Sequence, residues 1–326
     1  MEKMKETLPL IVLVGALSGI ATLAAGPVSL PYWGAQRMLF VAFVTALYLF
    51  TLFAVFLLVS LTRLPEFVDP KSGQVAVRAL WASMGSTEPL KNGFAIAVAV
   101  YGTTAAANLA ELYRVSPKVW YDAPLWALES GLFDFLLGSA LNMPRLWDAI
   151  YAPFWVLMML ASALLVIHGR GRRHLDLCLA LVIAFFIARG VALVFPTAGP
   201  VFYRPELFDL TDTRSQEWSQ QLRLYMAGHI PQPGYYPGTM AMPSLHISMA
   251  ALSLWAVGQE WRRSLWFSVP CLLLVWLSTV MLGWHYAVDG IGGIAVAGLS
   301  CYLATRFSRL FRGTPVPTGP AGIPPS

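Results

Sequence analysis

The chain has 326 residues, of which 57% are hydrophobic and only 12% are charged, and its net charge at pH 7 is +5. A single soluble core of this size would not need so many apolar side chains, so the composition argues against an ordinary soluble domain and for a membrane protein with several spans. The excess positive charge lies in short clusters beside apolar segments, and nothing in it indicates nucleic-acid binding.

Apolar runs divide the chain into about eight predicted membrane-spanning helices. Roughly 20 helical residues cross the ~30 Å of hydrocarbon in a bilayer, and several runs reach that length. The third run is weak because of its Gly, Thr and Asn content, and the sixth needs its flanks to be long enough. In chain order, the predicted spans are Leu10–Leu30, Met38–Leu61, Phe94–Leu112, Ala149–Ile167, Leu177–Phe195, Ile247–Val257, Leu265–Leu282 and Ala287–Ala304. A cleaved signal peptide is the alternative for the first run, which exceeds the usual apolar region of such a signal.

Basic clusters give the expected orientation, because short loops rich in Lys and Arg stay in the cytoplasm. With eight spans, every cluster falls on the same side, together with both chain ends. The clusters are Met1–Lys5, the loop of residues 63–91, residues 168–174, Arg262 with Arg263, and the arginines of residues 306–312. The segments around residues 197–245 and 283–287 are therefore expected at the extracytoplasmic face, which is periplasmic or luminal.

Three ionisable residues, His246, His285 and Asp289, meet at this outer face. A carboxylate in the first turn of a span is costly unless it is paired or faces a polar cavity. His285 and Asp289 are four residues apart, which puts them on one helix face if the helix already includes His285. The carboxylate would then hold one imidazole nitrogen and leave the other as a nucleophile or base. Each histidine alone also has a plainer interpretation, as a polar residue at the membrane interface.

The stretch "MPSLHIS", residues 242–248, supplies the second histidine at a predicted helix start. Pro243 suits such a start, Ser244 offers a hydroxyl, and the exposed N–H groups of the first turn attract anions such as phosphate. A nucleophilic histidine, a second histidine that can protonate a leaving oxygen and an anion-binding turn together predict phosphoryl transfer through a phosphohistidine. The same two histidines and Asp289 are also a possible metal-ligand set. That alternative ranks second because no further acidic ligand lies nearby, so we expect neither a metal nor a cofactor.

At these residues the chain resembles the type 2 phosphatidic acid phosphatase superfamily, and within it the inositol phosphorylceramide synthase branch. Residues 242–257 are similar to the second motif of the superfamily, and residues 278–294 to the third motif, in the branch's His-Tyr-x-x-Asp form. Residues 195–203, "FPTAGPVFY", resemble the first motif of the branch, and a fainter likeness covers residues 125–155.

This resemblance implies an all-α fold whose catalytic core is a six-helix, lipid-phosphatase-like bundle. It implies that His285 is the nucleophile, Asp289 its orienting partner, His246 the general acid and base, and Ser244 a phosphate contact.

Two positions depart from the phosphatase form of the motifs. Thr279 follows Ser278 where that form has an arginine, and Thr197 takes the place of the first motif's lysine. Both departures are expected of the synthase branch.

Some cation is still needed to meet the charge of a phosphate in the transition state. Arg189 lies in the outer half of a span, where an arginine should face the protein interior. Arg204 is the second candidate, with Arg214 and Arg223 as further alternatives, although ion pairs with nearby acidic residues are the plainer interpretation of these three. Two aromatic residues of the first and third motifs, Tyr203 and Tyr286, complete the predicted substrate contacts.

The apolar segment of residues 125–141 carries Glu129 and Asp134, and its predicted place is outside the membrane core. We interpret it as an interfacial or re-entrant helix rather than a ninth span. Its carboxylates could meet a polyol acceptor, but surface capping or a salt bridge is the favoured explanation.

The sequence therefore predicts three parts. Residues 1–93 form an N-terminal transmembrane hairpin with a cytoplasmic loop, residues 94–312 a catalytic membrane domain, and residues 313–326 a disordered Pro/Gly-rich tail. Within the catalytic domain, residues 197–245 form an outer loop that could cover the site.

The predicted function is transfer of a phosphorylated head group from a phospholipid donor to a lipid or polyol alcohol. Hydrolysis of a lipid phosphate or diphosphate is one alternative, and a non-enzymatic lipid-binding or transport protein is another. The oligomeric state and the identity of donor and acceptor do not follow from the sequence.

Overall fold

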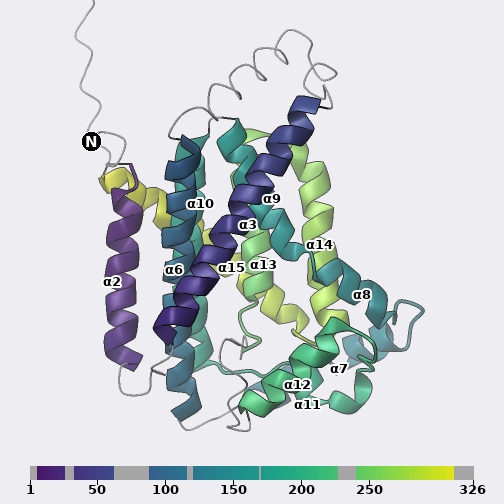
Figure 1. The fold of residues 1–326 in the computed structure, drawn as a ribbon. Helices are drawn as coiled ribbons and strands as arrows, with labels where there is room; N and C mark the ends of the chain where they lie inside the picture. Colours follow the sequence, from purple (N-terminus) through teal and green to yellow (C-terminus); the bar gives the residue numbers. More distant parts are fainter. Residues whose placement is uncertain are drawn as a thin grey trace, which may run out of the picture.

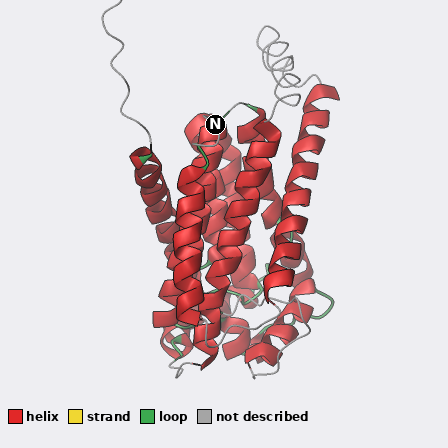
Figure 2. Cartoon of the chain, turned by 60° about the vertical axis from the view of Figure 1, so that its left-hand side comes forward, coloured by secondary structure: helices red, strands yellow, loops and turns green. Residues whose placement is uncertain are grey.

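The computed structural model describes most of the chain, and within the described residues every regular element is a helix (Figure 2). The described ranges are 6–25, 33–61, 88–115, 120–168, 170–226 and 240–311. Long helices lie side by side, and a group of short helices lies across one end of them (Figure 1). This arrangement confirms the prediction of an all-α bundle.

The helices fall into two groups by position. The long helices are α2 (Leu8–Ala25), α3 (Trp33–Leu61), α6 (Glu88–Val115), α9 (Phe154–Ile167), α10 (Gly171–Val194), α13 (Leu245–Glu260), α14 (Leu265–Met281) and α15 (Ala287–Leu310). The short helices at the lower end of Figure 1 are α7 (Asp122–Leu137), α8 (Pro144–Tyr151), α11 (Pro200–Tyr203) and α12 (Arg214–Met226). Two single 3₁₀ turns, η2 (Pro205–Leu207) and η3 (Arg262–Ser264), connect them to their neighbours.

Each of the eight predicted spans overlaps one of the long helices, but in the part of the chain that the structure describes five stretches are both long and apolar enough to cross a membrane. These stretches are Arg37–Val55, Pro144–Ile167, Gly171–Val194, Arg262–Met281 and Ala287–Leu310. The apolar part of α2 is short, α6 carries charged and amide side chains, and α13 has only 16 residues. These apolar helices indicate a membrane protein. The predicted number of eight spans and the predicted six-helix core stay predictions.

The fourth predicted span is not one continuous helix. Helix α8 ends at Tyr151 and α9 begins at Phe154, with Pro153 at the junction. Proline has no N–H to donate to the preceding turn and its ring clashes with that turn, so it interrupts the helix.

Helix α10 lies at the centre of the bundle and contacts α2, α6, α9, α13 and α15. Of its apolar stretch, 56% is buried, against 22% for α3 at the outside. Small residues such as Ala180, Ala184 and Ala188 line it and allow the neighbouring helices to approach closely. The outer helices expose large apolar side chains, including Phe50 of α3 and Trp266 of α14, as helices in contact with lipid do.

Helix α7 is the segment predicted as an interfacial helix, shifted by a few residues. It begins at Asp122 and ends at Leu137, rather than spanning residues 125–141, because Gly138 ends it. One face is buried against the second hydrophobic cluster through Phe133 and Leu136. The opposite face exposes an apolar row made of Leu128, Leu132 and Phe135. Such a row suits the interfacial location that the sequence predicts.

Several predictions fall on residues outside the described ranges. These are the start of the chain, most of the predicted cytoplasmic loop, the part of the outer loop at residues 227–239 and the tail from residue 313.

Candidate active site

The second motif forms the N-terminal turn of α13, as predicted. Ser244 is the N-cap residue, and its hydroxyl oxygen accepts a hydrogen bond from the N–H of Ile247 at 3.4 Å. Pro243 precedes the cap, and His246 lies in the first turn. Because the serine oxygen acts as acceptor in this bond, its own proton can be donated to a phosphate oxygen.

The third motif differs from the prediction in where its helix begins. Helix α14 ends at Met281, Gly283 adopts the left-handed conformation with φ of +71°, and α15 begins only at Ala287. His285 therefore lies in the turn before the helix and not on a shared helix face with Asp289. Its position is held by the carbonyl of Thr279, which accepts the N–H of His285 at 3.2 Å.

Asp289 still meets His285, because the carboxylate reaches back over the start of α15. Its Oδ2 accepts the N–H of Tyr286 at 2.8 Å and lies 3.5 Å from Nδ1 of His285. The second distance is longer than an ordinary hydrogen bond. Among the described residues, neither Nδ1 of His285 nor Oδ1 of Asp289 has another hydrogen-bond partner, so the two groups remain available to each other.

The two histidines face each other directly. Nδ1 of His246 lies 3.0 Å from Nε2 of His285, and the hydroxyl of Tyr151 lies 2.6 Å from Nε2 of His246. If Asp289 accepts the proton on Nδ1 of His285, then Nε2 of His285 carries the lone pair. His246 then donates from Nδ1, and its Nε2 accepts from the tyrosine. The four side chains thus form a series in which every donor points toward the carboxylate.

Burial differs along this series. His285 is 4% exposed, Asp289 and Ser244 are fully buried, and His246 is partly exposed. Phe154 packs edge-on against the His246 ring at 4.8 Å between centroids, and Tyr151 at 5.1 Å. The imidazole of His285 is therefore withdrawn from bulk water behind the partly exposed His246.

Close packing of α13 on α15 brings the two histidines together. A Cβ on Gly293 would lie 2.5 Å from the carbonyl oxygen of Ser244, so only glycine fits there. Ser248 donates a hydrogen bond to the Gly293 carbonyl at 2.9 Å, and the N–H of Ser244 donates to the Asp289 carbonyl at 3.0 Å. Gly293, the last glycine of "GWHYAVDGIGG", is thus required for the close approach of α13 and α15.

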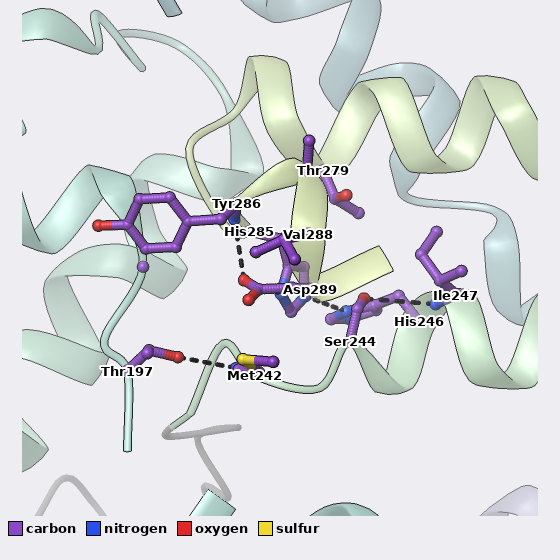
Figure 3. A network of polar contacts seen from close by, with 12 residues as sticks. Thr197, Met242, Ser244, His246, Ile247, Thr279, His285, Tyr286, Val288 and Asp289 are labelled. Carbon is purple, nitrogen blue, oxygen red and sulfur yellow. Dashed lines mark hydrogen bonds and ion pairs between the residues drawn. The ribbon is translucent and has the colours of Figure 1, made fainter. Parts of the chain in front are cut away.

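The first motif holds the other two motifs in place. The hydroxyl of Thr197 accepts the N–H of Met242 at 2.9 Å (Figure 3), and its carbonyl accepts the N–H of Ala241 at 2.8 Å. Further along, the N–H of Val201 donates to the Gly283 carbonyl at 2.9 Å. The residue at the place of the phosphatase lysine is therefore a buried structural link between motifs.

Glu129 caps a helix start, but from a buried position and not at the surface as expected. From α7, its two carboxylate oxygens accept the N–H groups of Ala287 at 2.6 Å and Val288 at 2.8 Å, at the start of α15. Burial raises the pKa of the Glu129 carboxyl, although these two hydrogen bonds oppose the rise. Glu129 thus fixes the helix start that carries Asp289. Asp134, by contrast, is exposed on the same helix.

Asp122 plays a similar part that sequence reasoning missed. Its carboxylate accepts the N–H groups of Ala198 and Gly199, each at 2.9 Å, and the Tyr286 hydroxyl at 3.2 Å. Burial is the main cause that raises the pKa of this carboxyl. The signal for it in the sequence is slight: an aspartate two residues before a proline at the start of an apolar segment.

The position of Tyr286 does not suit the substrate contact that we expected of it. Its ring is fully buried, and its hydroxyl is bound by Asp122 at the start of α7. Figure 3 shows the ring directed away from the imidazoles. Tyr286 therefore acts as a structural link from the third motif to α7.

The two main candidates for the phosphate contact, Arg189 and Arg204, differ in their position relative to the histidines and in their own ion pairs. Arg189 in α10 is partly buried and close enough for its charge to act on His246. Arg204 pairs with Glu206 at 3.5 Å, with its guanidinium over the rings of Trp126 and Tyr203, as the plainer interpretation of it expected. This arrangement favours Arg189 over Arg204 as the phosphate contact.

The two alternative arginines have other contacts. Arg223 donates to the carbonyl of Val201 at 2.7 Å and lies over the Phe202 ring. The N–H of Arg214 donates to Asp148, a third carboxylate that caps a helix start.

Within the described ranges, no three His, Cys, Asp or Glu side chains gather in a metal-binding arrangement, so the geometry gives the metal alternative no support.

A comparison with protein-family models finds one match to this chain, over residues 127–303, described as the PAP2 superfamily. The match covers more than half of the sequence and includes the three motifs and both histidines. The chain belongs to the PAP2 superfamily. This is the type 2 phosphatidic acid phosphatase superfamily that the motifs resemble, so the protein is an enzyme of the phosphatase or phosphotransferase type. No curated protein and no solved structure gives a significant match to it. The match to the PAP2 superfamily does not single out the inositol phosphorylceramide synthase branch.

Proposed function

We propose that this PAP2 enzyme transfers a phosphorylated head group from a phospholipid to a lipid or polyol alcohol, through an intermediate in which phosphorus is bonded to His285. The observation that carries the proposal is the series Tyr151–His246–His285, with Asp289 behind the second imidazole. In this series His246 can supply and take up a proton, and His285 presents an oriented nucleophilic nitrogen, as phosphoryl transfer requires.

In the first proposed step, Nε2 of His285 attacks the phosphorus, and the bond from phosphorus to the donor's lipid oxygen breaks. Forming the P–N bond makes the imidazole of His285 positive, and the Asp289 carboxylate offsets that charge at Nδ1–H. His246 takes up a proton when the anionic head group binds beside it and gives that proton to the departing oxygen, so the lipid alcohol leaves neutral. The phosphoryl group has to enter between the two facing imidazoles, with Arg189 and Ser244 as its proposed contacts.

In the second step, the hydroxyl of the acceptor attacks the same phosphorus and the P–N bond breaks. The acceptor's proton passes to His246, which is now neutral and acts as the base. His285 is restored with its lone pair on Nε2, and His246 is again protonated for the next cycle.

Two observations support transfer over hydrolysis. The nucleophile and its carboxylate are withdrawn from bulk water, which favours an acceptor that is held in the site over free water. Thr197 and Thr279, in place of the phosphatase cations, are fully buried and hydrogen-bonded to the backbone. Hydrolysis of a lipid phosphate or diphosphate is the second candidate. Membership of the superfamily sets the non-enzymatic alternative aside.

We also propose where the substrates come from and on which side of the membrane the reaction takes place. Both substrates come from the membrane or its surface, no cofactor takes part, and the histidines work at the extracytoplasmic face with both chain ends in the cytoplasm. The distribution of basic clusters in the sequence supports this orientation.

The test is head-group transfer by the purified full-length protein in detergent micelles. A phospholipid labelled in its head-group phosphate is supplied with and without ceramide, diacylglycerol or inositol. We expect a labelled product that forms only when an acceptor is present, and His285→Asn should lower its rate about a thousandfold or more.

His168→Asn is the matched control, since His168 is an exposed histidine outside the series and should keep wild-type activity. Release of the labelled phosphorylated head group into water regardless of acceptor, which is free phosphate when the donor is phosphatidic acid, would establish the hydrolase instead. Equal activity of His285→Asn and wild type would contradict both candidates.

A further inference from the structure

A cavity of about 620 Å³ lies at the end of the bundle opposite the histidines. It is lined by four arginines, Arg170, Arg172, Arg173 and Arg309, and by two acidic residues, Asp176 and Glu260. Helix α13 spans both sites, with His246 in its first turn and Glu260 as its last residue, which separates them by about 21 Å along the helix. The cavity is therefore distinct from the catalytic site.

The charges in this cavity are not balanced. Glu260 contacts two of the arginines, Arg170 at 2.9 Å and Arg173 at 3.4 Å. Among the residues that the structure describes, Arg172 and Arg309 form no ion pair with a carboxylate. Asp176 lies buried in the wall, where it accepts a hydrogen bond from Ser308 at 2.8 Å. The cavity thus has an excess of positive charge and two guanidinium groups whose donors an anion can use.

The shape and chemistry of this site suit a phosphate group. Guanidinium groups bind phosphate through paired N–H donors, more specifically than a lysine does. The volume lies within the range of small-molecule sites, about 300–1,000 Å³. Basic pockets between the ends of membrane helices are also the kind of place where anionic lipid head groups bind. The preference of basic residues for the cytoplasmic side would explain arginines at this end of the bundle, but it does not require them to line a cavity. Arg262 and Arg263 lie at the same end and do not line it.

We propose that this cavity is a second binding site of the protein, for a phosphate group carried by an anionic lipid head group or by a small phosphate ion. The site is separate from the reaction and does not depend on the function proposed above. Two of its ligands are Arg172 and Arg309, from the first turn of α10 and the last turn of α15. An occupant would link the ends of these two helices.

Calorimetric titration of the full-length protein in zwitterionic detergent tests this proposal. One arm uses dihexanoylphosphatidic acid, a second inorganic phosphate, and a third dihexanoylphosphatidylcholine, all at physiological salt. Arg172→Gln/Arg309→Gln should weaken binding in the first arm about tenfold or more, since two charge-assisted contacts are lost. His285→Asn should retain this binding component, which separates it from any binding at the catalytic histidines.

Arg262→Gln/Arg263→Gln is the matched control, because it removes the same charge from the same end of the bundle without touching the cavity lining. Loss confined to the phosphatidic acid arm assigns the site to a lipid head group, and loss in the phosphate arm as well assigns it to the phosphate ion. Equal weakening by the two double variants, or no weakening by either, would overturn the proposal. Arg172→Gln alone, at an exposed side chain, covers the case in which the double variant does not fold.

Discussion

Single side chains from distant parts of the sequence complete the histidine pair. Tyr151 lies 95 residues before His246, and the hydrogen bond between them joins α8 to α13. The two histidines, Asp289 and Ser244 were predictable because each belongs to a sequence motif that can be recognised. Tyr151 was not predictable, since nothing near it in sequence marks it and only the packing of α8 on α14 brings it to the site.

Tyr151→Phe removes the hydroxyl and keeps the ring that packs on Phe154 and His246. We expect turnover to fall about threefold to tenfold, the effect of one neutral hydrogen bond, and its pH optimum to shift because the phenol no longer fixes the proton on Nδ1 of His246. The measurement is turnover across pH, together with the unfolding temperature. Tyr302→Phe, at an exposed tyrosine of α15, is the control. An unchanged rate and pH profile in Tyr151→Phe would show that the tyrosine only packs.

At the scale of elements, acidic side chains at the end of the bundle with the short helices hold the starts of other elements. Glu129 caps α15, Asp122 binds the turn before α11, and Asp148 caps α12. For Glu129 the favoured explanation was surface capping or a salt bridge, so capping was predicted in part, without the buried position or the target. The partners of the other two could not be predicted because they lie 66 to 77 residues away.

The pKa of Glu129 gives this capping contact a pH dependence. Burial raises its pKa above the value of about 4.3 in an unfolded chain, so the folded protein binds the proton more tightly and ionisation costs stability. The group is thus most favourable below pH 4, and its contribution falls as the pH rises through the folded pKa. Glu129→Gln stays neutral, so the difference in unfolding temperature between this variant and wild type should shift in favour of the variant as the pH rises above about 4. A difference between the two proteins that does not change with pH would contradict this account.

Helix α15 offers a matched pair of glycines for testing the approach of α13, which carries His246, to α15, which follows the turn with His285. Gly293→Ala places a methyl group against the backbone of Ser244, whereas Gly298 has no neighbouring atom within 4 Å of an added Cβ. We expect Gly293→Ala to cost about 1–3 kcal/mol of stability and to lower activity, because α13 has to move away. Gly298→Ala should leave activity unchanged and stability equal or slightly higher. Equal activities of the two variants would show that this contact does not position His246.

For the whole molecule, hydrophobicity predicted where the long helices lie but not how they end. All eight apolar ranges overlap helices in the described part of the chain, because run length and composition determine burial in a membrane. Their ends depend on local backbone chemistry that an apolar run does not report, as at Pro153 and at Gly283. For that reason the helix of the third motif starts at Ala287, after His285, and the contact with Asp289 arises from a turn.

The predicted orientation can be tested with two exposed positions at opposite ends of the bundle. Asp209→Cys lies at the end with the short helices and Arg262→Cys at the other end. In intact spheroplasts of a bacterial host, a membrane-impermeant maleimide should label the first variant, and the second only after permeabilisation. Two of the native cysteines are buried, so the wild-type protein serves as the background control. The opposite labelling pattern would place the histidines in the cytoplasm.

The central claim is that His285 becomes covalently bonded to phosphorus. The most direct measurement is rapid mixing of the purified enzyme with a phosphate-labelled lipid donor, an alkaline quench that preserves the P–N bond, and mass spectrometry of the peptide that contains residue 285. We expect a phosphorus-bearing adduct on His285 that forms within one turnover, disappears when acceptor alcohol is added, and is absent in His285→Asn. Turnover by the wild type with no adduct on this peptide, or an adduct on another residue, would contradict the account.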